Sequence, residues 1–470
     1  MPETNKAVKQ KKVWTPDTFV LLFVLMVAIT LLTWIIPAGQ YDTVMDEATG
    51  RAVVDASSFH LIDKTPVGVM GFLKAIYQGC QNSAGIIFMI LLLGAYASII
   101  NTTGAISRGI SLIVKKYDKK ALFAIPVIMV VLSFLGASAV IVDACIAFIP
   151  VGMIIAKKLK LDPLAGAAII YLGCYAGWNS SFMAATSVQT AQQIAQLEPL
   201  SGLGYRVVVY ILFTAITIFY VMRYCMKVSK NRSNSLLSAD ELARFDEDIV
   251  TIDEGTFGGR DILVVLLFLG GIALYIVGSV SWGWGLDMMV AIMMAVGILG
   301  GFVGGMKPNE MAKAFAAGVK DCAFSAMIVG VASSLAVIMN SANIIHTIIH
   351  GASVLMGMFP SAIAAVVMFL VNLVFNFFVP SGPAQASIVM PIMAPLSDVL
   401  GISRQVAVLC FQYGDGLSNC IIPTSGVLMG VIGMSKLQYP QWLRFMLKLF
   451  LIWAAFIIVV ITVAVAIGYK

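Results

Sequence analysis

The fold is decided by residues 376–425, which read NFFVPSGPAQASIVMPIMAPLSDVLGISRQVAVLCFQYGDGLSNCIIPTS. Two apolar runs are interrupted here, by PSGP at 380–383 and by GDGLSN at 414–419. In hydrocarbon an unpaired backbone N–H or C=O group costs several kcal/mol, so non-helical backbone persists only inside protein or beside a wet cavity. A pair of interrupted membrane segments is the pattern of a transporter binding site, so we expect one at these breaks.

The composition is that of a polytopic membrane protein. Hydrophobic residues make up 60% of the chain and charged residues 11%, against roughly 25% charged in soluble proteins. The length of 470 residues allows about ten crossings of roughly 20 residues each. The net charge of +6 lies mostly in loops and indicates topology rather than a nucleic-acid partner. The seven cysteines show no CxxC spacing, so no zinc site is predicted.

Basic residues set the predicted topology of the first half. Four lysines within residues 1–13 place the N-terminus in the cytoplasm. A span at 19–37 leads to an outer loop ending at 66, and an amphipathic surface stretch at 67–82 precedes an inward span at 84–103.

Residues 121–156 are apolar and have lysines at both ends, so both ends are expected inside. Thirty-six residues are too few for two crossings and a turn. We therefore predict a re-entrant hairpin with its tip near Gly136-Ala137-Ser138. A single tilted span with misplaced positive charge is the alternative.

The remaining segments complete four predicted regions. Residues 1–66 hold the first span and its loop, 67–224 the first repeat, 225–306 a cytoplasmic linker with two spans, and 307–470 the second repeat. The first repeat ends with a broken helix at 162–196 and a return span. The second has a surface helix at 308–320, a span at 322–340, a hairpin at 361–397, a broken helix at 402–435 and a last span near 445–467. His346 and His350 fall in a predicted loop.

The two halves are internal repeats. Lys74 aligns with Lys313 and Asn101 with Asn340 at an offset of 239, and Tyr175 aligns with Tyr413 at an offset of 238. By the charge pattern, the first repeat starts outside and the second inside. This predicts an inverted-topology repeat with the binding site near the midplane. The predicted fold is all-α, with about nine transmembrane helices plus two opposed re-entrant hairpins.

Small and polar residues at the four breaks are the candidate substrate ligands, because hydroxyl and amide oxygens and freed helix N-termini suit small ions and carboxylates. They are Ser138, Asp143, Asn179, Ser180, Ser181, Ser381, Gln385, Asp415, Asn419 and Thr424. Simple packing or capping roles are the alternative for the hydroxyl and amide residues.

Asp143 and Asp415 are the two acids that we place near the midplane. An acid inside a membrane is costly, so it predicts a functional site. Asp415, expected in a non-helical break between two glycines, is predicted to bind a cation, a substrate ammonium or a proton. With Ser418 and Asn419 it is the candidate sodium site. For Asp143 a salt bridge or a helix cap is the alternative.

The chain contains none of the enzyme motifs HExxH, GxSxG or a phosphate-binding loop, so it is not expected to be an enzyme. A channel is the competing class. Channel pores usually come from symmetric oligomers with continuous rings of pore-lining residues. Two different broken helices in one chain favour alternating access instead.

The stretches NFFVPSGPAQASIVMPIMAPLSDVLG, RQVAVLCFQYGDG and PTSGVLMG resemble the YfcC-like family, which is grouped with the C4-dicarboxylate anaerobic carriers and the basic amino-acid antiporters. The N-terminal WTPDTFVLLF and LTWIIPAGQYD are similar to the same family. The resemblance covers essentially the whole chain and implies a homodimeric secondary carrier whose transport domain moves as an elevator. The chain departs from the family pattern at Val142-Asp143 and at 179–182, both at the expected site.

Together these features predict a secondary transporter of small amino-acid-like solutes in a bacterial-type inner membrane. Basic amino acids come first as substrates and C4-dicarboxylates second. Two acids at the site and no basic residue near the midplane favour a cationic or zwitterionic substrate. No cofactor is expected beyond sodium or a proton as coupling ion, and the expected partners are the solute, the lipid bilayer and a second copy of the chain.

Overall fold

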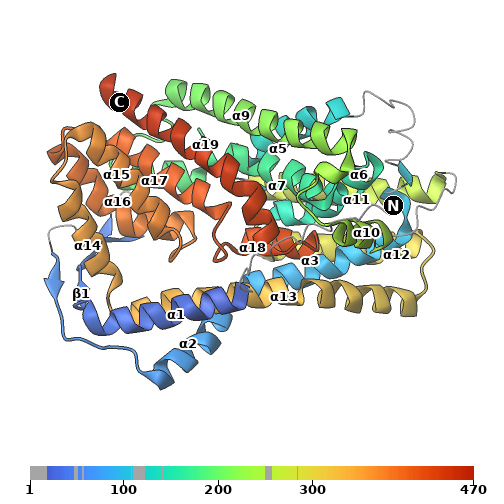
Figure 1. The fold of residues 1–470 in the computed structure, drawn as a ribbon, viewed down its shortest axis with the longest axis horizontal. Coiled ribbons are helices and arrows are strands. Elements are labelled where there is room, and N and C mark those ends of the chain that lie inside the picture. Colours follow the sequence, from blue (N-terminus) through green and yellow to red (C-terminus); the bar gives the residue numbers. More distant parts are fainter. Residues whose placement is uncertain are drawn as a thin grey trace, which may run out of the picture.

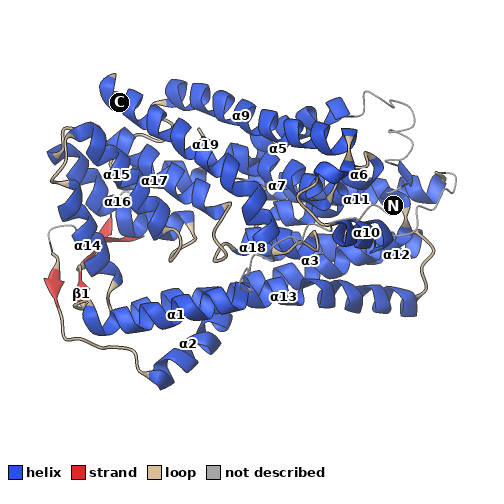
Figure 2. Cartoon of the chain, viewed as in Figure 1, coloured by secondary structure: helices blue, strands red, loops and turns tan. Residues whose placement is uncertain are grey.

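The computed structural model describes residues 18–46, 51–55, 58–106, 108–109, 122–139, 141–248, 257–282 and 284–470. This part of the chain is mostly helical, as Figure 2 shows. Five of its helices are long and apolar enough to cross a membrane: α1 (Thr18–Ile35), α3 (Ala84–Thr103), α9 (Leu203–Lys230), α13 (Pro308–Ser341) and α19 (Tyr439–Ala466).

The described chain has thirteen further α-helices. They are α2 (Val69–Asn82), α5 (Ala124–Ala137), α6 (Ile149–Lys158), α7 (Pro163–Asn179), α8 (Thr190–Ile194), α10 (Ala239–Asp248), α11 (Gly259–Trp282), α12 (Leu286–Val303), α14 (Ile345–Met356), α15 (Ser361–Phe375), α16 (Gly382–Val399), α17 (Arg404–Asn419) and α18 (Gly426–Met434). Short 3-10 turns η2 (Ala144–Phe148) and η4 (Arg232–Asn234) and a π-turn η3 (Ala185–Gln189) lie between them. In Figure 1, α1 and α13 lie along the lower part of the molecule and α9 along the upper edge, with α7 and α17 between them. Helix α19 runs obliquely from the upper left towards the centre.

The predicted outer loop contains the strands of the described chain. Strand β1 (Gly39–Gln40) pairs with β4 (His60–Leu61), and β2 (Thr43–Asp46) pairs with β3 (Arg51–Val54), both antiparallel. The prediction of an all-α fold is therefore incomplete, because the chain also contains these two short antiparallel strand pairs. The loop is anchored to α14, because the backbone N–H of Tyr41 donates to His346 Nδ1 at 3.2 Å.

Helices α7 and α17 form the centre of the molecule. Every residue of α7 is buried, as is every residue of α17 after Arg404. Both helices start at a side-chain cap: Asp162 accepts from the N–H of Ala165 at 2.8 Å, and Ser403 accepts from that of Val406 at 3.3 Å. A helix surrounded by protein on all sides can carry polar residues only where neighbours pair with them.

Helices α5 and α6 both pack against α7. α5 runs parallel to it, because Gly173 faces Met129 and Gly177 faces Ser133. α6 runs antiparallel to it and approaches closely where Gly152 meets Gly166. The segment predicted as the first hairpin therefore begins and ends at the same end of α7.

Helices α15 and α16 have the same relation to α17. Cys410 donates to the carbonyl of Ala365 at 3.2 Å, and Gly414 faces Asn372, so α15 runs parallel to α17. The hydroxyl of Ser361 donates to the carbonyl of Leu400 at 2.6 Å, which brings the start of α15 to the end of α16. The two groups of three helices thus share one arrangement. Their re-entry into a bilayer and their relation by inverted repetition stay predictions.

Two boundaries in the second half differ from the predictions. A separate surface helix at 308–320 is wrong, because α13 is continuous to Ser341. No proline follows Pro308 in this helix, and Gly318 sits tightly against Gly94 of α3, where a Cβ would lie 2.2 Å from the Gly94 carbonyl oxygen. The predicted loop around His346 and His350 is also wrong, since both lie on α14.

Candidate binding site at the helix breaks

The C-terminal ends of α7 and α17 meet, and the chain leaves both helices there. Gly416 makes this contact possible, because a Cβ at this position would lie 2.8 Å from the Cα of Asn179. The Asn179 amide donates to Cys420 Sγ at 3.7 Å, and the Tyr171 hydroxyl donates to the carbonyl of Asn419 at 3.0 Å. The two breaks are thus one structural feature.

The breaks themselves begin later than predicted. α7 is helical through Asn179 and α17 through Asn419, so the stretch 414–419, predicted to be non-helical, is the last part of α17. The glycines allow close approach instead of ending the helix. Asp415 is therefore a helical residue, and the chain becomes irregular only between Cys420 and Ser425.

Asp415 is 1% exposed and faces the beginning of α16. Its Oδ1 accepts from the Asn419 amide at 3.4 Å, while its Oδ2 has no hydrogen-bond partner among the described residues. A Cβ at Gly382, the first residue of α16, would lie 3.3 Å from that Oδ2 and 3.5 Å from Trp178. A helix N-terminus carries unpaired N–H groups and favours negative charge, so this surrounding suits a carboxylate.

Asn376, which follows α15, was not predicted as a site residue. It is fully buried, and its amide nitrogen lies within hydrogen-bond distance of the Asp415 carbonyl (2.9 Å), Ser418 Oγ (2.8 Å) and Asn419 Oδ1 (3.1 Å). An amide within an apolar run at 361–379 was the sequence signal that could have identified it. Ser418 also donates to the carbonyl of Gly414 at 2.6 Å.

Several buried oxygen atoms near the breaks have no hydrogen-bond partner among the described residues. They are Asn179 Oδ1, Asn376 Oδ1, Gln385 Oε1, Asp415 Oδ2 and Thr424 Oγ1. Each unpaired buried polar group costs about 1–3 kcal/mol, so a cluster of acceptors indicates a missing donor or cation. Oxygen ligands with one carboxylate fit a hard cation or an ammonium group.

The other predicted ligands have different surroundings. Gln385 is buried on α16 and donates to the carbonyl and side chain of Asn372, both at 3.1 Å. Ser381 precedes α16 and is exposed. Thr424 lies in the irregular segment before α18 and is 7% exposed.

The predicted serines of the first half are engaged in local bonds. Ser138 donates to the carbonyl of Leu135 at 2.7 Å, and Ser180 donates to that of Ala176 at 2.6 Å. Ser181 donates to the carbonyl of Ala137 at 2.6 Å and so ties the first break to the end of α5. These hydroxyls position backbone, and their role in ligand binding stays a prediction.

Asp143 lies in the turn between α5 and η2, and its side chain is exposed. A joint site for Asp143 and Asp415 stays a prediction. Two carboxylates that share one site repel each other, and a bound cation relieves that repulsion.

A buried basic residue contacts α17, and it was not among the predicted site residues. Arg206 of α9 is 1% exposed, and its guanidinium donates to the side-chain oxygen of Gln412, one turn before Asp415. It also donates to Gln405 at 3.5 Å. Gln412 in turn donates to the carbonyl of Ser181 at 2.6 Å, which links Arg206 to the first break. Arg206 was missed because it lies close to the polar stretch that precedes α9 in the sequence.

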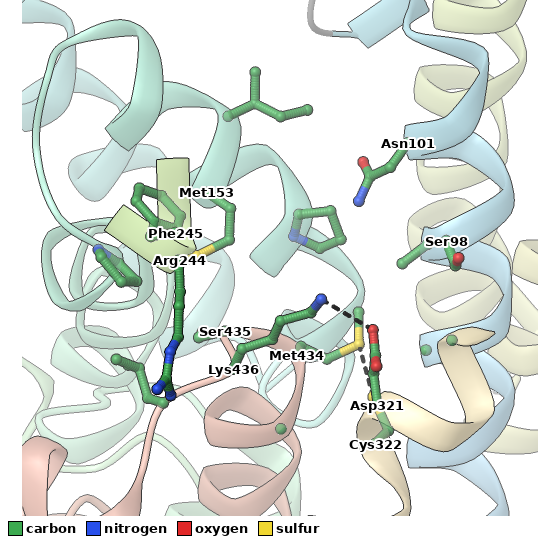
Figure 3. A pocket seen from close by; sticks show the side chains of 18 of the residues that line it. Ser98, Asn101, Met153, Arg244, Phe245, Asp321, Cys322, Met434, Ser435 and Lys436 are labelled. Carbon is green, nitrogen blue, oxygen red and sulfur yellow. Dashed lines mark hydrogen bonds and ion pairs between the residues drawn. The ribbon is translucent and has the colours of Figure 1, made fainter. Parts of the chain in front are cut away.

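A cavity of about 480 Å³ lies elsewhere, between α3 and α13 on one side and α6, α10 and α18 on the other (Figure 3). None of the predicted site residues lines it. The candidate binding site at the breaks is tightly packed, and the cavity is a separate feature.

The family model for the C4-dicarboxylate anaerobic carrier (DcuC) matches residues 15–467. A relative from Escherichia coli (strain K12), YfcC, provisionally named as a basic amino acid antiporter, is 29% identical over 467 residues, covering 91% of this chain and 92% of its own length. An uncharacterized protein from Haemophilus influenzae is 23% identical over 487 residues, covering 94% of this chain and 96% of its own.

Two solved transporter structures are also similar. The YdaH transporter of Alcanivorax borkumensis aligns with 97% of this chain and 99% of its own, at 16% identity and a TM-score of 0.42. MtrF of Neisseria gonorrhoeae, described as an antimetabolite efflux pump, aligns with 97% of this chain and 96% of its own, at 17% identity and a TM-score of 0.43.

Proposed function

Because the chain belongs to the C4-dicarboxylate anaerobic carrier family, we propose that this membrane transporter is a secondary carrier of small amino-acid-like solutes. Basic amino acids are the first candidates, moved by exchange or by coupling to an ion. The name of the Escherichia coli relative supports this class. The alternative from the family description is a C4-dicarboxylate carrier coupled to sodium or protons.

The observation that carries the proposal is the Asp415 carboxylate. It is buried, and one of its oxygens has no hydrogen-bond partner among the described residues. A solute ammonium group would supply hydrogen-bond donors and positive charge to both acids. The first turn of α16, beside Asp415, would receive the solute carboxylate through its free N–H groups.

Sodium is the second ligand that this chemistry fits. The predicted sodium ligands are Asp415, Ser418 and Asn419, and of these Asp415 has an unpaired buried oxygen. Asn179 and Asn376, which were not in that set, add unpaired amide oxygens. Ser418 and Asn419 lie in the same last turn of α17, where both contact the amide of Asn376. One carboxylate with neutral oxygens would balance a monovalent ion.

Transport would proceed by alternating access of an elevator type. In this scheme α5 to α7 and α15 to α18 move together past α3 and α13, and the two hairpins carry the site. The functional unit would be a homodimer in a bacterial-type inner membrane, with the N-terminus in the cytoplasm.

Arg206 favours the dicarboxylate alternative. It is a buried cation that donates to Gln412, the residue one helical turn before Asp415, and no carboxylate among the described residues forms an ion pair with it. A dianion needs positive charge nearby, and Arg206 would provide it together with bound sodium.

Exchange in proteoliposomes distinguishes these substrates. Vesicles are loaded with arginine, ornithine, a neutral amino acid or succinate, and uptake of the labelled counterpart is followed with and without a sodium gradient. The proposal predicts exchange of basic amino acids. Sodium-driven succinate uptake without amino-acid exchange would replace it with the alternative, and lack of uptake across the panel would contradict both.

A further inference from the structure

The cavity in Figure 3 has two walls from different helix groups. Ser98 and Asn101 lie on the α3 wall, and Arg244 of the linker helix α10 lies on the opposite wall. Its volume of about 480 Å³ is in the range of small-molecule sites, roughly 300–1,000 Å³.

Two polar atoms of the cavity lining have no hydrogen-bond partner among the described residues. Ser435, which ends α18, is 3% exposed and its hydroxyl is buried. The side-chain oxygen of Asn101 is buried on the facing wall. Burial of a polar group without a hydrogen bond costs free energy, so these two atoms are expected to bond a ligand or an ordered water.

The lining also carries charges of both signs. Asp321 of α13 and Lys436, just after α18, form an ion pair at 3.1 Å that joins the two walls, and both side chains are nearly half exposed. Arg244 is exposed, and within the described part of the chain its guanidinium has no ion-pair partner. Glu241 also lines the cavity and accepts from the Ser238 N–H at 2.8 Å and from the Gln441 amide at 2.5 Å.

We propose that this cavity is a second binding station for a zwitterionic solute, separate from the helix breaks. The solute carboxylate pairs with Arg244, its ammonium group pairs with Asp321, and the Ser435 hydroxyl completes the hydrogen bonding. This inference rests on the proposed function, since it takes the same class of solute. The station lies at the end that carries α10, which the charge pattern places in the cytoplasm.

The station also has a consequence for movement. An ammonium group at Asp321 competes with Lys436 for the same carboxylate and weakens the ion pair between α13 and the end of α18. Occupancy of the cavity therefore favours separation of the two walls.

Equilibrium binding of labelled arginine to the purified full-length protein tests the station. The wild type is expected to bind two arginines per chain, and Asp415→Asn one. In the Asp415→Asn background, Arg244→Gln should weaken the remaining site about tenfold or more, as loss of a charged hydrogen bond does, and Ser435→Ala several-fold. Arg223→Gln, at an exposed arginine outside the cavity, is the matched control and should have no effect.

Further outcomes separate this inference from the proposed function. Agmatine, which lacks the carboxylate, should not compete at the remaining site. One arginine per wild-type chain, abolished by Asp415→Asn, would overturn the second station and leave the proposed function intact. No arginine binding by the wild type would overturn both. Residual binding that neither Arg244→Gln nor Ser435→Ala weakens would also place the second site outside this cavity.

Discussion

The Oδ2 atom of Asp415 lies so close to Gly382 that a Cβ atom on this glycine would be 3.3 Å from it. An acid on α17 and the first residue of α16 thus enclose one small space, with Trp178 beside it. The proposed function depends on this space, because it is where the unpaired carboxylate oxygen and the N-terminus of α16 face each other.

Filling that space should impair transport without unfolding the protein. Gly382→Val places methyl groups between Asp415, Trp178 and Ser187, so we expect the initial rate of exchange to fall about tenfold or more. Gly85→Val is the control, because no atom lies within 4 Å of a Cβ at Gly85 in α3. A Gly382→Val protein with the wild-type rate would show that ligands do not occupy this space.

The contact between Asn179 and Gly416 should be sensitive to one methyl group. In Gly416→Ala the new Cβ meets the backbone of α7 at 2.8 Å, which cannot rotate away, and overpacking of this kind costs about 1–3 kcal/mol. Thermal unfolding in detergent measures the loss. Gly270→Ala in α11 adds a Cβ to open space and should be neutral or stabilising by up to about 1 kcal/mol. Equal melting temperatures for the two variants would contradict the close crossing of the breaks.

These glycines show where sequence reasoning reached its limit. The motif Gly-Asp-Gly-Leu-Ser-Asn predicted a break, yet α17 continues through it. The glycines at 414 and 416 are needed for close packing instead, because Asn372 and Asn179 occupy the space that side chains there would fill. Glycine permits a bend and a close approach equally, and only the neighbouring helix decides between them. The apolar runs, by contrast, predicted the positions of α1, α3, α9 and α19, because the length and hydropathy of a run can be read from the sequence without knowing which helix packs beside it.

The same limit applies to the site residues. Asp415 was identifiable because an acid in an apolar region is costly wherever it packs. Arg206 was not, because burial of an arginine near a helix start depends on Gln405 and Gln412, which are 199 and 206 residues away.

Arg206 is expected to support the fold through these two glutamines. Arg206→Met leaves the Gln412 oxygen without its donor, at about 1–3 kcal/mol, whereas the Gln405 oxygen still accepts from the Gln192 amide at 3.4 Å. Removal of a buried charge offsets part of this loss. We expect a lower melting temperature for Arg206→Met. Arg206→Lys should recover part of the loss, because the compact ammonium group can bond one glutamine oxygen but lacks the planar guanidinium fork that reaches both. A methionine variant as stable as the wild type would mean that the guanidinium contributes nothing net through these bonds.

Relative movement of α13 and α18 can be tested with a native cysteine. Cys322 Sγ lies 3.6 Å from Met434 Sδ. In Met434→Cys, oxidation or mercury should link the two positions and stop transport, and a reducing agent or excess thiol should restore it. Met434→Cys combined with Cys322→Ala controls for modification of a single thiol. Full transport by the linked protein would contradict an elevator in which these helices slide past each other.

The central claim is that the Asp415 carboxylate binds the transported solute or its coupling ion, and arginine exchange by Asp415→Asn in proteoliposomes tests it most directly. Asparagine keeps the size and removes the charge. The control is Asp398→Asn, at a half-exposed surface acid paired with Arg404. We predict that Asp415→Asn folds and loses exchange by at least about tenfold, while Asp398→Asn keeps it. A folded Asp415→Asn protein that exchanges arginine at the wild-type rate would contradict the account.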